Sequence, residues 1–225
     1  MTKALIFDSG TLINLSMNGL LDLLTKLKED FDGKFMITKE VKYEVVDRPI
    51  GIYRFELGAL RVQNLIDLGI LELPSNIGIS DELIKKDTKE FGEIANHSVQ
   101  VGDKWVNIVS DGEMSCLALS KELTRLNIKN IIAIDERTTR VLSENPESME
   151  RIMSEKIHKR VHVDEEKLGA FSKFKFIRSS EIVYSAYKKG LTDVKGKKAL
   201  EALLYATRFK GAAISFEEID ILKKM

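Results

Sequence analysis

The sequence predicts an α/β fold, with a mostly parallel central sheet and helices on both of its faces. Short apolar runs of strand length alternate with longer segments of helical periodicity from one end of the chain to the other. Hydrophobic residues make up 44% of the 225 residues and charged residues 31%, with only 3 Pro and 14 Gly, as in an ordered globular chain. No repeat or linker-like boundary appears, so we expect one domain over residues 1–225, with an inserted charged helical segment around 141–173.

The amino-terminal part is expected to hold two strand–helix pairs. Residues 3–7 (KALIF) form a short apolar run, typical of a buried parallel strand, and the run stops at Asp8. Leucines then recur at about helical spacing over residues 11–27, and Asp8 can cap this helix at its start. The apolar residues 35–37 lead into a second helix over 38–46.

The remaining elements alternate in the same way. Helical patterns cover residues 55–68, 81–97, 114–126, 151–162, 182–188 and 198–208. Strand candidates cover residues 70–73, 99–109, 130–134 and 174–178. The run 99–109 is broken at Gly102 and leads into Ser110, so we expect it to end as a strand of the sheet just before the next helix.

The compartment is predicted from what the chain lacks. Cys116 is the only cysteine and lies in an apolar helical pattern, so nothing argues for disulfide bonds. Charges interrupt every apolar stretch before it reaches membrane-spanning length, and the first apolar run is too short for a signal peptide. We therefore expect a cytoplasmic protein without a membrane partner.

The overall charge hides two opposed parts. The formal net charge is 0, which by itself does not mark a nucleic-acid-binding protein. Residues 1–150, however, carry 18 basic and 25 acidic residues, whereas residues 151–225 carry 17 and 10. Such a division suits a metal site beside a polyanion track, although chance produces it as well. Lys159, Arg160 and Arg178 are our candidate contacts to a nucleic acid.

Carboxylates follow three of the expected strands. Asp8 and Asp135 each come after an apolar run, Asp111 and Glu113 follow a third, and Glu44 lies on the helix over 38–46. The carboxyl ends of parallel strands meet at one edge of a sheet, where like charges are costly without a cation. Hard oxygen ligands without thiolates or imidazoles favour Mg²⁺ or Mn²⁺, and such sites clamp phosphate oxygens and activate water. The pattern therefore predicts phosphoester hydrolysis.

Four segments in order resemble the acidic motifs of PIN-domain proteins: DSGTLINL with Asp8, ITKEVKYEV with Glu44, SDGEMSCLALS with Glu113 and IAIDERTTRVL with Asp135. The closing segment FIRSSEIVYSAYKKGL is similar to the last strand and helix of that family, so the likeness spans nearly the whole chain. The resemblance implies a metal-dependent nuclease, usually a ribonuclease, in which Mg²⁺ or Mn²⁺ activates water for in-line attack at phosphorus.

The resemblance also implies roles for individual residues. The four acids of these motifs are the expected catalytic residues and bind metal directly or through water, with Asp111 as a helper. Thr11 and Ser179 are expected to position water or phosphate. Gly10 stands where many family members carry a small hydroxyl residue. The segments before Ser110 and over 141–173 are longer than in compact toxin-type members, so a toxin and a stand-alone RNA-processing enzyme both stay open.

Purely structural interpretations exist for several of these residues. Asp8 could serve only as a helix cap, and Ser110 with Glu113 spells the S-x-x-E capping box. Capping alone does not explain why several strand ends present acids. His158 and His162 lie four residues apart, but Zn²⁺ needs further nitrogen or sulfur ligands, so we expect a basic surface on a helix there. The aromatic residues Trp105, Tyr184 and Tyr187 are expected in the core.

Two other functions compete with the nuclease. The segment IFDSGTL is similar to the opening motif of haloacid-dehalogenase-like phosphatases, but Gly10 replaces the second Asp, which would be the proton donor. A catalytically inactive PIN-like module that binds RNA or a protein is the other alternative. RNA is the expected partner; a homodimer stays open, and an inhibitor protein is not indicated by the sequence.

Overall fold

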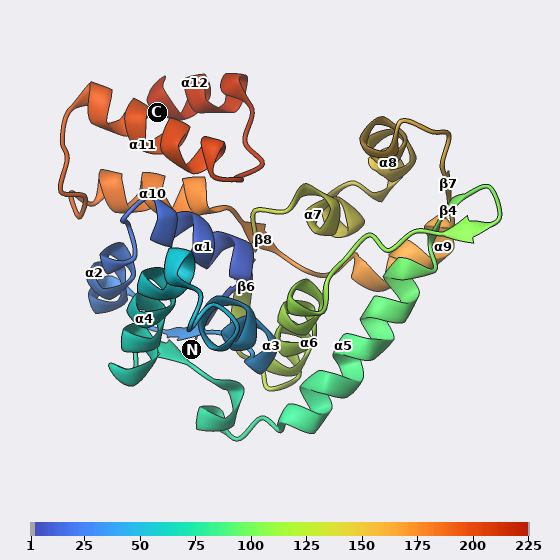
Figure 1. The fold of residues 1–225 in the computed structure, drawn as a ribbon, viewed down its shortest axis with the longest axis horizontal. Helices are drawn as coiled ribbons and strands as arrows, with labels where there is room; N and C mark the ends of the chain where they lie inside the picture. Colours follow the sequence, from blue (N-terminus) through green and yellow to red (C-terminus); the bar gives the residue numbers. More distant parts are fainter. Residues whose placement is uncertain (1–2, 225) are drawn as a thin grey trace.

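The computed structural model of the chain describes residues 3–224, which form a five-stranded parallel sheet with flanking helices (Figure 1). The strand order is β3-β2-β1-β6-β8, and all four neighbouring pairs are parallel. The predicted α/β class is therefore confirmed. The strands are β1 (Lys3–Phe7), β2 (Lys34–Met36), β3 (Leu71–Glu72), β6 (Lys129–Ala133) and β8 (Phe176–Ile177).

Helices cover both faces of this sheet. Successive side chains along a strand point to opposite faces of the sheet, whereas register partners on neighbouring strands share a face. Leu5 and its partner Ile131 therefore point to one side and Asn130 to the other. Ser120 of α6 bonds to Asn130, whereas Leu5 and Ile131 line a hollow together with α2 and α10. The helices are α1 (Ser9–Met17), α2 (Asp22–Asp30), α3 (Lys39–Lys42), α4 (Tyr53–Asp67), α5 (Asp81–Asn96), α6 (Asp111–Arg125), α7 (Arg137–Glu144), α8 (Met149–Ile157), α9 (Glu165–Leu168), α10 (Ser179–Lys188), α11 (Lys197–Phe209) and α12 (Phe216–Lys224). Short 3₁₀ turns occupy Pro74–Ile77, Pro146–Ser148 and Gly169–Phe171.

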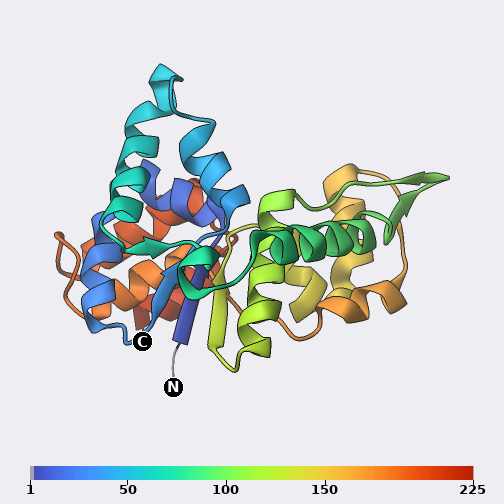
Figure 2. The same cartoon turned by 90° about the horizontal axis from the view of Figure 1, so that it is seen from below.

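A second, antiparallel sheet was not expected. It consists of β4 (Val99–Val101), β5 (Lys104–Trp105) and β7 (His162–Val163), in the order β5-β4-β7. Figure 2 shows the β4–β5 hairpin projecting at the far end of α5, away from the large sheet. The predicted strand leading into Ser110 is wrong, because Ile108 and Val109 donate their backbone N–H groups to Asn96 Oδ1, at 2.7 and 3.2 Å, and not to a neighbouring strand.

Three other expectations also need correction. The helix predicted over 11–27 is two helices, α1 and α2, because Gly19 adopts a φ of 69° between them. The helix predicted over 151–162 ends at Ile157, where His158 takes a left-handed conformation, so His158 and His162 do not share a helical face. Trp105 is 44% exposed and is not a core residue. The last helix, α12, was not predicted.

The core is largely continuous. One cluster of buried apolar residues runs from Ala4 in β1 to Leu203 in α11, and a smaller one joins α11 to α12 around Leu204 and Ile219. Within residues 3–224, none of the helices combines the length and the apolar character that a bilayer span requires.

Candidate metal centre

Asp8 lies at the carboxyl end of β1, as the sequence predicted. It caps α1 by accepting a hydrogen bond from the Gly10 N–H on Oδ2 at 3.0 Å. Its own N–H donates to Ala133 O at 2.9 Å, which ties it to the end of β6. The residue is 3% exposed, and Oδ1 is buried without a hydrogen-bond partner among the described residues. The cap therefore accounts for only one of the two carboxylate oxygens.

Glu44 lies in a widened turn that continues α3. Residues Tyr43–Asp47 form a π-helical turn, a local geometry that is frequent at functional sites. The Glu44 carboxylate packs against the backbone of Gly112 in α6, where an added Cβ would come within 2.7 Å of Oε2 and 2.8 Å of Oε1. Within residues 3–224, the Glu44 carboxylate makes no hydrogen bond or ion pair. Its carboxylate is therefore free to accept another ligand.

Glu113 is both a helix cap and a member of the acidic group. The predicted capping box is confirmed: Glu113 Oε2 accepts from Ser110 N at 3.2 Å, and Ser110 Oγ accepts from Glu113 N at 3.4 Å. Thr139 Oγ1 donates to the same Oε2 at 2.6 Å. Glu113 lies in the first turn of α6, and it does not directly follow a strand of the large sheet as Asp8 does.

The negative charges of Glu44 and Glu113 act on Asp8. Burial, followed by the negative charge of Glu113 and then that of Glu44, raises the pKa of Asp8 to about 8 from an ordinary 3.8. Burial also raises the pKa of Glu113, against a lowering by the Thr139 hydroxyl. No Lys or Arg of the described chain forms an ion pair with any of the three. These acids are therefore gathered without a counter-charge, which is costly in a buried site.

Asp135 lies at the same edge, two residues beyond β6, but its partners are neutral. Its Oδ1 accepts the Ser179 N–H at 2.8 Å, and its Oδ2 accepts from Asn14 Nδ2 at 3.0 Å. Burial raises the pKa of Asp135, while the hydrogen bonds from Ser179 and Asn14 lower it. The fourth predicted acid is thus held in place by a network of its own.

The expected helper residues differ in position. Asp111 is exposed at the first position of α6. Thr11 and Ser179 are fully buried, and their hydroxyl oxygens have no hydrogen-bond partner among the described residues. The Ser179 hydroxyl still lies close enough to Asp135 to lower the pKa of that carboxyl, so only the Thr11 hydroxyl of these two acts on no other described group.

The predicted nucleic-acid contacts separate into two groups. Lys159 and Arg160 are exposed between α8 and β7. Arg178 does not lie on the expected surface: it is 8% exposed, and its guanidinium pairs with Glu181 at 2.9 Å and with Glu218 at 2.7 Å. Its two Nη groups are committed to these carboxylates and the side chain is buried, so we no longer place it among phosphate contacts.

The donor set at this edge suits a hard cation that keeps part of its water. In the described part of the chain, no group of three or more His, Cys, Asp and Glu side chains could hold a metal ion by itself. Mg²⁺ commonly binds through one or two carboxylates and retains several waters, which a substrate phosphate can replace. Asp8 Oδ1, buried and unpartnered, and the unbonded Glu44 carboxylate match that requirement.

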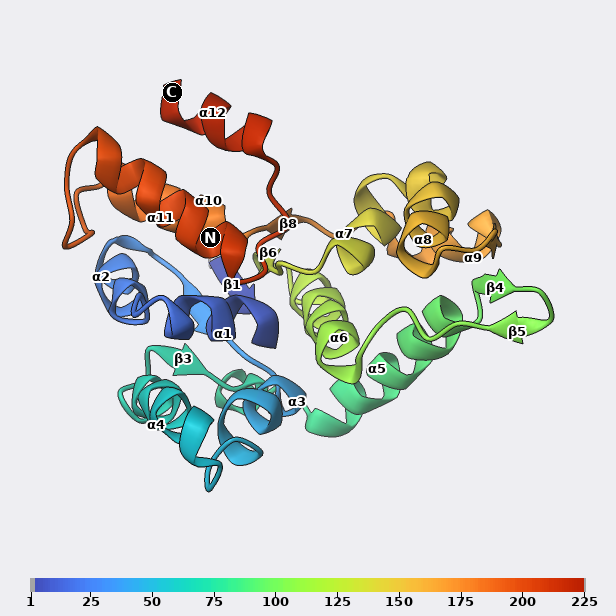
Figure 3. The ribbon, with the colours of Figure 1, turned by 45° about the horizontal axis from the view of Figure 1, so that its top comes forward.

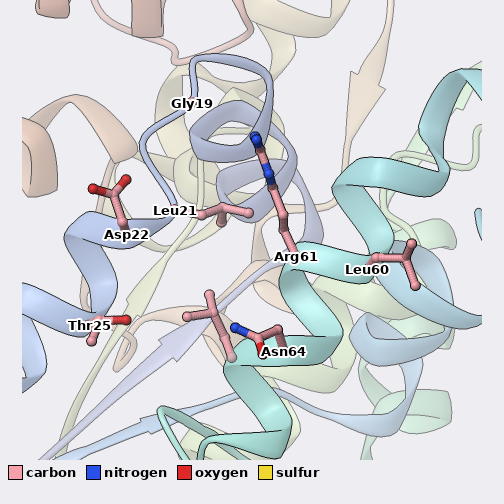
Figure 4. Close-up of a pocket in the computed structure, with 8 residues that line it drawn as sticks. Gly19, Leu21, Asp22, Thr25, Leu60, Arg61 and Asn64 are labelled. Carbon is pink, nitrogen blue, oxygen red and sulfur yellow. The ribbon is translucent and has the colours of Figure 1, made fainter.

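A cavity of about 510 Å³ elsewhere in the fold is not part of this site (Figure 4). It lies between the α1–α2 connection and α4, at the opposite end of α1 from Asp8. Its polar lining residues are Asp22, Thr25, Arg61 and Asn64. None of the predicted acids lines it, and Asp22 pairs with Lys26.

Comparison of the chain with models of known protein families, with curated proteins and with solved structures gave no match. The likeness to PIN-domain proteins therefore rests on the acidic motifs and their order in the sequence.

Gly112→Ala should weaken metal binding more than it weakens the fold. The added Cβ would displace the Glu44 carboxylate, which can swing aside because it is the end of a flexible side chain. We expect the Mn²⁺ concentration that gives half of the maximal stabilisation against urea to rise by about tenfold, as is typical when a metal ligand loses its orientation. The urea midpoint without metal should change little. Gly92→Ala on α5, where a Cβ meets nothing within 4 Å, is the matched control. If both variants need the same Mn²⁺ concentration for half-maximal stabilisation, Glu44 is not a metal ligand.

Proposed function

We propose that this chain is a metal-dependent nuclease that hydrolyses phosphodiester bonds in RNA, with Mg²⁺ or Mn²⁺ as its cofactor. One observation carries the proposal: Asp8 is buried with an unpartnered oxygen and a pKa raised to about 8, beside two carboxylates that have no counter-charge. A divalent cation offsets this repulsion and gives the oxygen a partner. The order of the acidic motifs supports a PIN-like arrangement.

The proposed roles follow from how each acid is held. Asp8 and Glu44 have carboxylate oxygens without hydrogen bonds to described residues and are the proposed direct ligands. Glu113 and Asp135 accept bonds from Thr139, Ser179 and Asn14, so they are proposed to act through water. When bound, the metal supplies an activated water and neutralises charge on the phosphate. The hydroxyls of Thr11 and Ser179 orient that water or a phosphate oxygen.

The phosphatase alternative is not favoured by the geometry. A haloacid-dehalogenase-like mechanism needs a carboxyl at position 10 to protonate the leaving group, and Gly10 has only its N–H, which is bonded to Asp8. RNA binding without any cleavage would support the other alternative, a PIN-like module that binds RNA but does not catalyse its hydrolysis.

The test is cleavage of labelled single-stranded RNA with Mg²⁺, Mn²⁺ or EDTA. Asp8→Asn should lower the metal-dependent rate by roughly 10³-fold, because several kcal/mol of stabilisation at phosphorus depends on the cation that Asp8 holds. Asp22→Asn, an exposed acid on α2 that pairs with Lys26, is the matched control and should cleave at the wild-type rate.

Cleavage that persists in EDTA, or that Asp8→Asn leaves intact, would contradict the proposal. Para-nitrophenyl phosphate is added as a second substrate. Turnover of this ester in place of RNA would support the phosphatase instead.

A further inference from the structure

The Oδ2 atom of Asp135 is held through a residue that also binds the carboxyl-terminal helices. Asn14, in the middle of α1, is fully buried. Its Nδ2 donates to Asp135 Oδ2 at 3.0 Å and to Thr207 O near the end of α11 at 2.9 Å. One amide group therefore joins an acid of the site to a backbone carbonyl of α11.

The orientation of this amide is fixed by a second asparagine. Asn18, one turn further along α1, donates from Nδ2 to Asn14 Oδ1 at 2.8 Å and to Ala206 O at 3.3 Å. Because Asn14 Oδ1 receives a donor, its Nδ2 must face the two acceptors, Asp135 and Thr207. The network leaves the Asn14 amide a single arrangement that satisfies it.

The Oδ1 atom of Asp135 is held from the same direction. It accepts the N–H of Ser179, the first residue of α10, and the residue before it is Arg178. The Arg178 guanidinium donates to Ala213 O at 3.0 Å and pairs with Glu218 of α12 at 2.7 Å. Arg178 thus connects the start of α10 to α12.

Asn14 directly, and Ser179 through the adjacent Arg178, are therefore attached to one structural unit, the carboxyl-terminal hairpin, defined here as residues 197–224. Its helices α11 and α12 share a small apolar core, and α11 packs on α10 (Figure 3). Among the described residues, hydrogen bonds from Asn14 and Arg178, each of which is buried, join the hairpin to the groups that hold Asp135. Docking of the hairpin and orientation of Asp135 are consequently coupled.

We propose that the carboxyl-terminal hairpin positions Asp135, with Asn14 and Arg178 as positioning residues: Asn14 donates directly to Oδ2, and Arg178 acts on Oδ1 through the N–H of its neighbour Ser179. This inference rests on the proposed function, because it assigns a control element to the same site. Displacement of the hairpin would remove the contacts that orient both donors to Asp135, so the geometry of this acid depends on the docking of residues 197–224. A buried carboxylate that loses oriented donors loses its fixed geometry, which a metal-bound water requires.

The test uses the full-length chain with Asn14→Ala, Glu218→Gln and Glu201→Gln. Glu218→Gln removes the charge opposite Arg178 but keeps the capping box with Ser215, so α12 retains its start. Glu201→Gln breaks an exposed ion pair with Lys223 inside the same hairpin and is the matched control.

The first readout is amide hydrogen exchange of Ser179 in metal-free protein, measured by NMR against Ile132 as an internal reference. Ile132 N–H donates to Lys175 O, which lies outside the hairpin. We expect exchange at Ser179 to become at least about tenfold faster in Asn14→Ala and Glu218→Gln, with Ile132 unchanged and Glu201→Gln like wild type.

The second readout is the Mn²⁺ dependence of RNA cleavage, for which we expect a higher half-saturating Mn²⁺ concentration in the same two variants. Unchanged exchange at Ser179 in Glu218→Gln, or equal acceleration in Glu201→Gln, would overturn the inference. Because the exchange readout needs neither metal nor RNA, it decides the inference even if wild-type protein cleaves nothing, a result that would overturn only the proposed function. If Asn14→Ala fails to fold, Glu218→Gln carries the decision.

Discussion

Asp8→Asn is expected to stabilise the metal-free protein at pH 7 by on the order of 4 kcal/mol. In the folded chain the pKa of Asp8 is about 8, against 3.8 for an ordinary Asp. At pH 7 the side chain is therefore ionised when unfolded and protonated when folded, and each pH unit between 3.8 and 7 costs about 1.4 kcal/mol of stability. Asn has the same shape, carries no charge and can still accept the Gly10 N–H.

Urea denaturation at pH 7 in EDTA measures this gain. Asp22→Asn is the control, because the Asp22 side chain is 54% exposed and its surface pair with Lys26 should matter by less than about 1 kcal/mol. If metal-free Asp8→Asn protein is no more stable than wild type, burial and the neighbouring charges do not destabilise the Asp8 carboxylate. Together with lost cleavage, the expected result would mean that the carboxylate at this position serves chemistry at a cost in stability.

Metal-free wild type should lose stability as the pH rises from about 4 to about 8, and Mn²⁺ should reverse that loss. The raised pKa of Asp8 means that the folded chain binds more protons than the unfolded one in this window, so the free energy of unfolding falls with pH. Burial raises the pKa values of Glu113 and Asp135 in the same direction. Mn²⁺ competes with these protons, so it should raise the melting temperature more at pH 8 than at pH 5.

Thermal denaturation at both pH values, with and without Mn²⁺, measures the difference. At about 100 times the dissociation constant, a ligand adds about 2.7 kcal/mol to the stability of the folded state. Asp8→Asn should flatten both the pH dependence and the Mn²⁺ effect, which separates Asp8 from other titrating groups. A Mn²⁺ shift of the same size at pH 5 and pH 8 would argue against binding at buried, protonated carboxyls.

Much of the sheet could be predicted because its strands are buried on both faces and read as short apolar runs. Residues 3–7 and 130–134 were placed within one residue of β1 and β6. The apolar run 106–109 was misassigned because the backbone N–H groups of Ile108 and Val109 are bonded to the side chain of Asn96, more than ten residues earlier. Periodicity does not reveal a side chain that replaces a strand partner.

The positions of Asp8 and Asp135 at one edge also followed from the sequence, since both come at the ends of neighbouring parallel strands. The residues that orient the acids did not. Asn14 and Asp135 are 121 positions apart, and Thr139 reaches Glu113 across 26. The one available signal was a lone Asn among the apolar residues of LINL, which marks a buried polar group in need of partners.

The widened turn at Tyr43–Asp47 makes the spacing between Glu44 and α4 sensitive to chain length. A π-helical turn accommodates one residue more than an α-helical turn. Deletion of a single residue after Glu44 would convert the π-helical turn into an ordinary α-helical turn. The chain from Arg48 onward would then be rotated about the helix axis by about 100° relative to Glu44. Related chains that differ by one residue in this segment would therefore present a different surface of α4 beside an unchanged acid.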